Sequence, residues 1–372
     1  MDLDLDLDDP RDRSPLQQML DLALMAAYAG GQVLRTLWRL MGAEALGSST
    51  EAEMEECRPS RRHPQRKSQK EHHYNHQGGE GDYLRYDEIL LAKMRNNNDK
   101  KHQYPRLVTV VCGFPKNFAM YPRYVRGKFG EDAWFHSSSP QADTLGVADG
   151  VGGWRSYGID PGEFSDFLMR SCHRLATNRN YDARRLDWLL SRAYLDLLEQ
   201  KCPVLGSSTV CLLSLNRENS TVYTANIGDS GFLAVRSGRI LCRSLEQQHQ
   251  FNTPYQLSSP PPNLGGQFLI DSPDSADFQE FKTRPGDVLL LATDGVYDNL
   301  PLELILEVLS EMAGVEDQMV LQMTANSLAL MARTLSTNPL YDSPFSRKAR
   351  KMNVESSGGK RDDITVLLAS VI

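Results

Sequence analysis

The sequence predicts an α+β protein whose β-strands pair antiparallel. Predicted strands and predicted helices occur in separate runs along the chain, which favours α+β layering over a doubly wound fold. Two pairs of neighbouring strands are joined by turns, at residues 216–219 and at Ser237-Gly238, that are too short for a parallel crossover. With 372 residues, of which 40% are apolar, the chain can bury a sizeable core.

The net charge and the cysteine spacing argue against several classes of protein. A net charge of −7 gives no reason to expect a nucleic-acid partner. The six cysteines are scattered and form no Cys-x-x-Cys pair, which argues against a zinc site and against a dense disulfide framework. We therefore expect a reducing, intracellular compartment.

An apolar, helix-compatible stretch at residues 15–41 follows an acidic start. Residues 1–9 alternate Asp with Leu, which is typical of a solvated tail. The stretch carries Arg35 and Arg39 and no acid after Asp21, as in an amphipathic mitochondrial import segment. A surface or membrane-associated helix fits the same composition. No integral membrane span is expected, because glycines and arginines interrupt the run of about 20 apolar residues that a span requires.

Residues 51–101 have the composition of a linker. An acidic cluster gives way to a basic one, and then to His72, His73 and His76 and an asparagine tract. Apolar residues are too sparse to offset the entropy of ordering, so a disordered polar tract is favoured over a weak histidine metal site. The chain thus divides into residues 1–103, a targeting-like segment with a linker, and a folded domain at 104–372.

The folded domain is expected to open with a strand at residues 106–112, because that segment is β-branched and a Gly-Phe-Pro turn ends it. A short buried strand at 145–148 follows. Apolar residues then recur at helical spacing in residues 161–177 and 183–201, and Pro203 closes the second helix.

A run of strands comes next. These segments are apolar or β-branched and are separated by turn residues, at 209–215, 221–227, 231–236 and 239–243. A proline-rich surface loop at 258–266 precedes a fully apolar strand at 287–293. The expected order is completed by helices at 302–309 and 318–334, an irregular stretch to residue 359 and a last strand at 364–371.

Acidic residues stand beside the apolar strands. They occur at four places: Glu131 and Asp132, Asp149, Asp294 and Asp298, and Asp362 and Asp363. Asp-Gly is also a common turn dipeptide, so Asp149-Gly150 taken alone is consistent with a simple turn. Carboxylates crowded at the strand ends of one core would repel one another, however, and such clusters usually hold a cation. No histidine or cysteine adjoins these strand ends, which favours Mg²⁺ or Mn²⁺ over zinc.

Five motifs carry a family resemblance. In chain order they are Ala148-Asp-Gly-Val-Gly-Gly153, Gly206-Ser-Ser-Thr209, Ala225-Asn-Ile-Gly-Asp-Ser230, Thr293-Asp-Gly-Val-Tyr-Asp298 and Arg361-Asp-Asp-Ile-Thr-Val366. Their order and spacing resemble those of the metal-dependent type-2C Ser/Thr protein phosphatases, over residues 104–372. Within that family, residues 149–155, 228–233 and 246–255 are similar to the Ptc-seven subgroup, whose members are mitochondrial.

The resemblance implies a four-layer sandwich of two antiparallel sheets flanked by helices, with two Mn²⁺ or Mg²⁺ ions at one end. Asp149 matches the aspartate that bridges both ions, and the carbonyl of Gly150 matches a backbone ligand. Asp294 and Asp362 match carboxylates of the other ion. The acidic pair of Glu131 and Asp132 matches the residues that hold metal-bound water.

The implied activity is hydrolysis of phosphoserine and phosphothreonine in protein substrates. A water molecule between two divalent ions about 4 Å apart loses proton affinity and can attack phosphorus in line, without a covalent phospho-enzyme. The subgroup implies the mitochondrial matrix, with the cytoplasm as the alternative. We expect a monomer, because the sequence has no heptad repeat.

Two positions depart from the family pattern. Many members carry a histidine, a candidate general acid, where this chain has Val151, and His249 is the substitute that the sequence offers. The family's phosphate-binding arginine falls at Gly127, so the neighbouring Arg126 or Lys128 is the candidate for that role.

Two other functions can be weighed. Gly228-Asp-Ser-Gly231 has the letters of a serine-protease nucleophile motif, but it opens a hairpin and lacks the flanking histidine that such enzymes use. The alternative to catalysis is a pseudophosphatase that binds a partner. Retention of Asp149, Asp294 and Asp362 argues against that reading.

Overall fold

The computed structural model describes residues 104–117, 127–262 and 268–372. The predicted acidic tail, import segment and linker lie outside the described residues, and so does Arg126. No helix in the described ranges combines the length and the apolar content that crossing a membrane requires.

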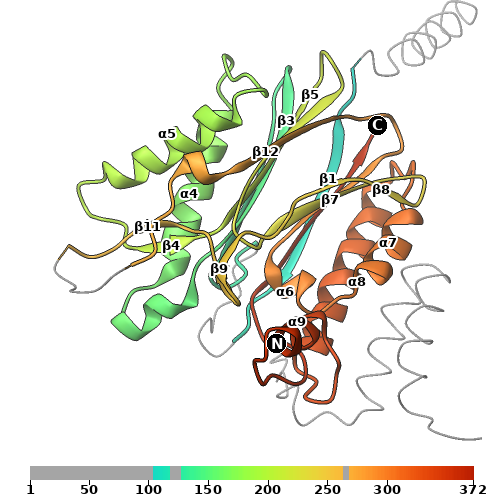
Figure 1. Cartoon of the computed structure of the whole chain (residues 1–372). Helices are drawn as coiled ribbons and strands as arrows, with labels where there is room; N and C mark the ends of the chain where they lie inside the picture. Colours follow the sequence, from blue (N-terminus) through green and yellow to red (C-terminus); the bar gives the residue numbers. More distant parts are fainter. Residues whose placement is uncertain (1–103, 118–126, 263–267) are drawn as a thin grey trace, which may run out of the picture. The chain divides into compact units, whose positions relative to one another are not determined.

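Two five-stranded antiparallel sheets form the centre of the fold (Figure 1). The first sheet has the order β1 (Leu107–Phe114), β14 (Ile364–Val371), β13 (Val288–Ala292), β7 (Gly231–Arg236) and β8 (Arg239–Arg243). The second sheet has the order β12 (Asp277–Lys282), β6 (Thr221–Ile227), β5 (Val210–Asn216), β3 (Ala142–Asp149) and β2 (Asp132–Ser138). The predicted antiparallel pairing is confirmed.

Helices cover the outer face of each sheet. The second sheet packs against α4 (Pro161–Ala176) and α5 (Leu186–Leu198), and the first sheet packs against α7 (Leu302–Ser310) and α8 (Gln318–Ser336) (Figure 1). The result is the four-layer αββα sandwich that the family resemblance implied.

Strand β5 shows how the sequence produces these layers. Its residues are apolar on both faces because both faces are covered. Leu213 points into the core between the sheets, while Leu212 points into the core beneath α4 and α5. Both side chains are fully buried, and each contributes about 1.5–3 kcal/mol to the free energy of unfolding.

Helix α4 begins where the chain leaves the glycine-rich turn after β3. Pro161 stands in its first turn, and the side chain of Asp160 accepts a hydrogen bond from Gly162 N at 3.0 Å. These two start signals fix the helix directly after the short 3₁₀ helix η3 (Gly152–Tyr157). The turn that follows Asp149 is therefore anchored at both ends.

The structure corrects the expectation that the chain is irregular between residue 335 and residue 359. Helix α9 (Pro344–Lys351) lies in this stretch, where only Ser346 and Ala349 are buried. The helix has no apolar stripe, so its hydrophobic pattern could not predict it. Its capping signal was readable, because Ser343 Oγ accepts a hydrogen bond from Ser346 N at 3.0 Å ahead of Pro344.

Candidate metal centre

The antiparallel pairing of β2 with β3 brings two of the predicted acids together. Asp132 begins β2 and Asp149 ends β3, and the two residues are direct cross-strand partners. Strands that run in opposite directions place the start of one beside the end of the other, so this edge of the second sheet carries two carboxylates.

The first sheet also carries two acidic residues at the ends of neighbouring antiparallel strands. Asp294 follows β13 as the first residue of the short helix α6 (Asp294–Tyr297), and Asp362 stands ahead of β14. Ala292 at the end of β13 pairs with Val366 near the start of β14. Both carboxylates therefore lie at one edge of the first sheet.

The two sheets bring these edges together, as the electrostatics of Asp149 show. Burial raises the pKa of Asp149 well above its usual range, and the charges of Asp294, Asp132, Asp362 and Asp229 raise it further. Carboxylates from both sheets thus act on one group. Asp294 and Asp362 of the first sheet therefore lie close enough to Asp149 of the second sheet to act on its charge.

Asp132 links the second sheet to the first. Its Oδ2 atom accepts hydrogen bonds from Thr293 Oγ1 at 2.8 Å and from Thr365 Oγ1 at 2.7 Å, and both threonines belong to the first sheet's edge. Its pKa is raised, chiefly by burial and then by the charge of Asp363, despite these hydroxyl donors.

Gly150 occupies a position with no room for a side chain. A Cβ atom there would lie 2.6 Å from the carbonyl oxygen of Pro161 and 2.9 Å from that of Glu131. Its backbone N–H donates to Glu131 O at 3.1 Å. The glycine therefore lets the turn after Asp149 pack directly against the start of α4 and the segment before β2.

Two lysines that the sequence analysis missed stand among the carboxylates. The Nζ atom of Lys360 is in close contact with Asp294 Oδ2. It also lies 2.9 Å from Asp298 Oδ2 and 3.4 Å from Asp362 Oδ2. Its pKa is raised: burial opposes the charge, and the three carboxylates outweigh that effect. Nothing in the sequence pattern marks this lysine, apart from its place beside the Arg361-Asp-Asp motif.

Lys116 reaches the other side of the cluster from the loop after β1. Its Nζ atom lies 2.5 Å from Glu131 Oε2, 3.5 Å from Asp362 Oδ1 and 3.8 Å from Asp363 Oδ2. These carboxylates raise its pKa although burial opposes the ammonium charge. The lysine lies far from each partner in sequence, so only the fold reveals the contact.

Glu131 has different partners from its neighbour Asp132. Its buried side chain contacts Lys116 and the Nε atom of Arg155, and Arg155 also reaches Asp160 Oδ1 at 3.1 Å. Arg155 comes from η3, the helix that follows the glycine-rich turn. Glu131 therefore holds two cations that are each 29% exposed beside the carboxylate cluster.

Asp229 is a further member of the cluster. Burial raises its pKa, followed by the charge of Asp294. Its Oδ2 atom accepts from Gln248 Nε2 at 3.3 Å. From the sequence, Gly228-Asp-Ser-Gly231 was expected only to open a hairpin, and the signal for a closer role was the position of Asp229 just after the end of β6.

The remaining candidates lie apart from these contacts. Lys128 is exposed and makes no ion pair with a described residue. Gly127 packs against Trp134, whose indole Nε1 donates to its carbonyl oxygen at 2.7 Å. The ring of His249 stacks on Tyr255, with centroids 4.2 Å apart, and its Nε2 lies 2.9 Å from Asp271 Oδ2.

The donor set suits a hard divalent cation. Three carboxylate oxygens are buried without a hydrogen-bond partner among the described residues: Asp132 Oδ1, Asp229 Oδ1 and Asp294 Oδ1. A buried acceptor without a partner costs about 1–3 kcal/mol. The pKa values of Asp132 and Asp229 are raised, chiefly by burial and then by neighbouring carboxylates, so negative charge at these two groups is unfavourable. Oxygen donors of this kind match Mg²⁺ or Mn²⁺.

Lysine ammonium groups bridge these carboxylates in the structure. In the part of the chain that is described, no three Asp, Glu, His or Cys side chains converge on one point as a ready ligand set. Lys360 and Lys116 instead offset the charge of Asp294, Asp362 and Glu131. Binding of divalent ions would therefore require the carboxylates to exchange an ammonium partner for a metal.

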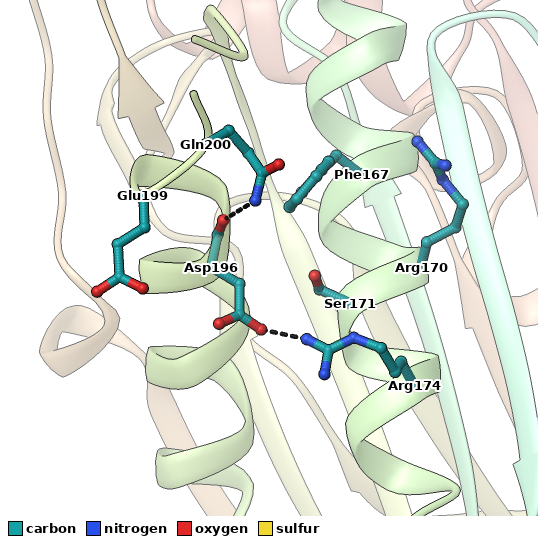
Figure 2. Close-up of a pocket in the computed structure, with 7 residues that line it drawn as sticks. All are labelled: Phe167, Arg170, Ser171, Arg174, Asp196, Glu199 and Gln200. Atoms are coloured by element: carbon teal, nitrogen blue, oxygen red, sulfur yellow. Dashed lines mark hydrogen bonds and ion pairs between the residues drawn. The ribbon is translucent and has the colours of Figure 1, made fainter. Parts of the chain in front are cut away.

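A groove of about 450 Å³ between α4 and α5 lies away from this cluster (Figure 2). The ion pair of Arg174 with Asp196 crosses it, and Arg170 borders it from α4. None of the predicted site residues lines the groove.

Comparisons with known proteins agree with the geometry. Residues 122–329 match the profile of a family described as protein phosphatase 2C. The chain is 47% identical over 270 residues to the "Protein phosphatase PTC7 homolog fig" of Drosophila ananassae, covering 72% of this chain and 81% of that protein. It is also 47% identical over 265 residues to the "Protein phosphatase PTC7 homolog" of Homo sapiens, covering 71% of this chain and 87% of that protein.

A solved structure has the same arrangement of layers. The X-ray structure of the photosystem II phosphatase PBCP superposes with a TM-score of 0.60 at 28% identity, over 72% of this chain and 99% of that chain.

Proposed function

Because the chain belongs to the protein phosphatase 2C family and, within it, to the PTC7 group, we propose that it hydrolyses phosphoserine and phosphothreonine in proteins. The observation that supports the proposal is that Asp294 and Asp362, at the edge of one sheet, lie close enough to Asp149, at the edge of the other, to raise its pKa. Few structural needs explain so many mutually repelling carboxylates, whereas a centre for divalent cations does.

Two Mn²⁺ or Mg²⁺ ions are part of the proposal. Asp149 and the Gly150 carbonyl would hold one ion, with Asp149 shared with a second ion that Asp294 and Asp362 complete. Such ions lower the pKa of a water molecule and offset the charge of phosphoryl oxygens. The contribution of Asp132 is to keep the two sheet edges in register through Thr293 and Thr365.

Lys116 and Arg155 are the cations that we assign to the substrate phosphate. Both are partly exposed and both are oriented by the buried carboxylate of Glu131. Gly127, at the family's arginine position, has no side chain to offer. Charge-assisted hydrogen bonds from an ammonium and a guanidinium group are the usual means of holding a phosphate dianion.

Substitution Lys116→Ala is expected to lower kcat/KM for a phosphothreonine peptide by about 10- to 100-fold, the value of one hydrogen bond to a charged group. A loss of phosphate binding predicts that KM rises more than kcat falls, and that Lys116→Arg restores part of the affinity. Lys128→Ala is the matched control and should remain within about twofold of wild type. A large loss with Lys128→Ala and none with Lys116→Ala would reverse the assignment. Melting temperatures must accompany the assay, since Lys116 also neutralises Glu131.

The direct test of function is an assay of the full chain on matched phosphothreonine, phosphoserine and phosphotyrosine peptides with Mn²⁺. We expect hydrolysis of the first two at least about tenfold faster than of the third, and loss of all activity when EDTA removes the ions. A folded protein that binds Mn²⁺, as measured by calorimetry, but hydrolyses none of the peptides would support the partner-binding pseudophosphatase instead.

Delivery to the mitochondrial matrix is a separate part of the proposal. It rests on the acid-free, arginine-containing stretch at residues 22–43 and on the group to which the chain belongs. Fractionation of cells that express the full chain tests it, and recovery in the cytosol alone would contradict it.

A further inference from the structure

Helix α9 brings a dense positive charge to the edge of the proposed active site. Four of its eight residues are basic: Arg347, Lys348, Arg350 and Lys351. The backbone N–H of Phe345 in its first turn donates to Asp298 O at 3.0 Å, and Lys348 Nζ lies 3.5 Å from Asp298 Oδ1. Asp298 in turn shares Lys360 with Asp294, so a single residue, Asp298, connects α9 to the carboxylate cluster. Helix α9 lies beside α6 (Figure 1).

Two of these cations form no ion pair within 4.0 Å with a described carboxylate, although the charge of Arg347 contributes to the lowered pKa of Asp342. Lys348 pairs with Glu246 at 2.5 Å as well as with Asp298, and Arg350 pairs with Asp342 at 2.5 Å. Arg347 and Lys351 are exposed, and no carboxylate in the described ranges pairs with either of them. They are four residues apart and so lie on one face of the helix.

The contacts of the fold account for only part of this charge. Cations near a helix C-terminus stabilise it, which accounts for Lys351. Arg347 stands in the first half of α9, where the helix dipole disfavours a cation, and it faces the like charge of Lys351 one turn later. The helix is held instead by its Ser343 cap and by buried Ser346 and Ala349. Arg347 is thus the cation of α9 that contributes least to the stability of the helix.

We propose that the exposed face of α9 at Arg347 and Lys351 binds acidic residues that flank the phosphorylated residue of a protein substrate. This inference rests on the proposed function, because it takes the carboxylate cluster as the place where the phosphate is hydrolysed. The partner is defined by charge complementarity: an extended segment whose aspartates, glutamates or additional phosphates meet the two exposed cations.

The spacing fits a peptide of moderate length. An eight-residue helix is about 12 Å long, and an extended peptide advances about 3.3 Å per residue. The length of α9 thus corresponds to about four residues of an extended peptide, and acidic residues about three to five positions from the phosphorylated residue are the ones to test. Arg361 is exposed beside Asp362 and adds to the same positive field closer to the centre.

The test compares three phosphothreonine peptides of equal length, which have the same residues except at the positions that are varied. One peptide carries acidic residues about three to five positions before the phosphothreonine, a second carries them the same distance after it, and a third has amides at all these positions. The full-length wild-type protein is expected to prefer one acidic peptide over the amide peptide by about fivefold or more in kcat/KM, mainly through KM. Raising the salt concentration should reduce the preference, because exposed charges are screened.

The double variant R347Q/K351Q should bring that preference to within about twofold while hydrolysing p-nitrophenyl phosphate as fast as wild type. R184Q/R185Q is the matched control. It removes the same charge from two exposed arginines that pair with Asp182 and Asp187 near α5, and it should retain the preference. An equal fall for all three peptides in R347Q/K351Q, or a wild-type protein with no preference, would overturn the proposal.

Two further outcomes can be distinguished from substrate docking: failure of the proposed function, and binding of α9 to a lipid surface. If the wild-type protein hydrolyses neither peptides nor p-nitrophenyl phosphate, the proposed function fails, and anisotropy measurements with the labelled peptides then test docking alone. Sedimentation with vesicles of phosphatidylcholine and cardiolipin tests a lipid surface. Loss of vesicle binding in R347Q/K351Q with an unchanged peptide preference would assign α9 to a membrane and contradict substrate docking.

Discussion

Asp149→Asn is expected to lower phosphatase activity by about a thousandfold or more while raising the thermal stability of the metal-free protein. The loss of activity follows because an amide cannot neutralise two cations, and removing one group that supports transition-state charge typically costs a factor of 10² to 10³. The gain in stability follows because the substitution removes one of several carboxylates that repel one another.

The sign of the pH dependence follows from the direction of the pKa shift. The pKa of Asp149 is raised in the folded state by burial and by neighbouring carboxylates. The folded protein therefore binds its proton more tightly than the unfolded chain does, and this stabilising effect is lost as pH rises through the folded-state pKa. We expect metal-free wild-type protein to lose stability on going from acidic to neutral pH, and the variant to lose less.

Melting curves in EDTA at several pH values provide the measurement. Asp143→Asn is the matched control, because Asp143 is also buried but pairs with Arg217 at 2.6 Å and accepts from Leu107 N at 2.9 Å. Breaking that pair should lower stability by about 3–5 kcal/mol. If Asp149→Asn destabilised the metal-free protein as Asp143→Asn does, repulsion between the clustered carboxylates would not be lowering the stability of the metal-free protein.

Gly295→Ala is expected to disrupt both the fold and the site. A Cβ atom at Gly295 would lie 2.0 Å from the carbonyl oxygen of Asp363 and 3.1 Å from Ile364 Cγ1. The first contact is with a backbone atom, which cannot move aside by a change of side-chain rotamer. Helix α6 must therefore move away from the start of β14. Overpacking of this severity costs about 3 kcal/mol or more.

A loss of that size corresponds to about 6–12 °C in melting temperature. Activity should fall even when Mn²⁺ is saturating, because the displacement separates Asp294 from Asp362. Gly153→Ala tests the same change in the turn after Asp149, where no atom lies within 4 Å of the added methyl, and it should be nearly neutral. A stable and active Gly295→Ala protein would show that α6 and β14 can separate without consequence for the site.

The sequence predicted the central strands well and the peripheral elements poorly. Strands β6 and β14 match their expected ranges closely, because each is a continuous apolar or β-branched run that is buried in a sheet. Edge strand β12 reads Asp-Phe-Gln-Glu-Phe-Lys and is exposed along one face, so it offered only two apolar residues. Helix α9 buries two small residues and gave no periodic signal.

The candidate site divides in the same way. Its aspartates were predictable because each stands directly after or before a recognisable strand, and antiparallel pairing then brings strand ends together. Lys116 and Lys360 were not, because a lysine in a loop has no sequence pattern that specifies its partner. Asp229 lay between these cases: its turn was identified, but its distance from Asp294 depends on how the two sheets pack.

The hydrogen bonds from Thr293 and Thr365 to Asp132 set a limit on motion as well as on position. No described strand of one five-stranded sheet is hydrogen-bonded to a strand of the other. The two sheets can therefore move relative to each other only by sliding or separating along the core between them. Any such movement at this end must break contacts to a buried carboxylate, each worth about 1.5–3 kcal/mol. The separation of Asp149 from Asp294 is thus governed by the thickness of the core. A change of volume at Leu213 or Leu289, which are both buried in this core, is therefore expected to change the separation of the two carboxylates.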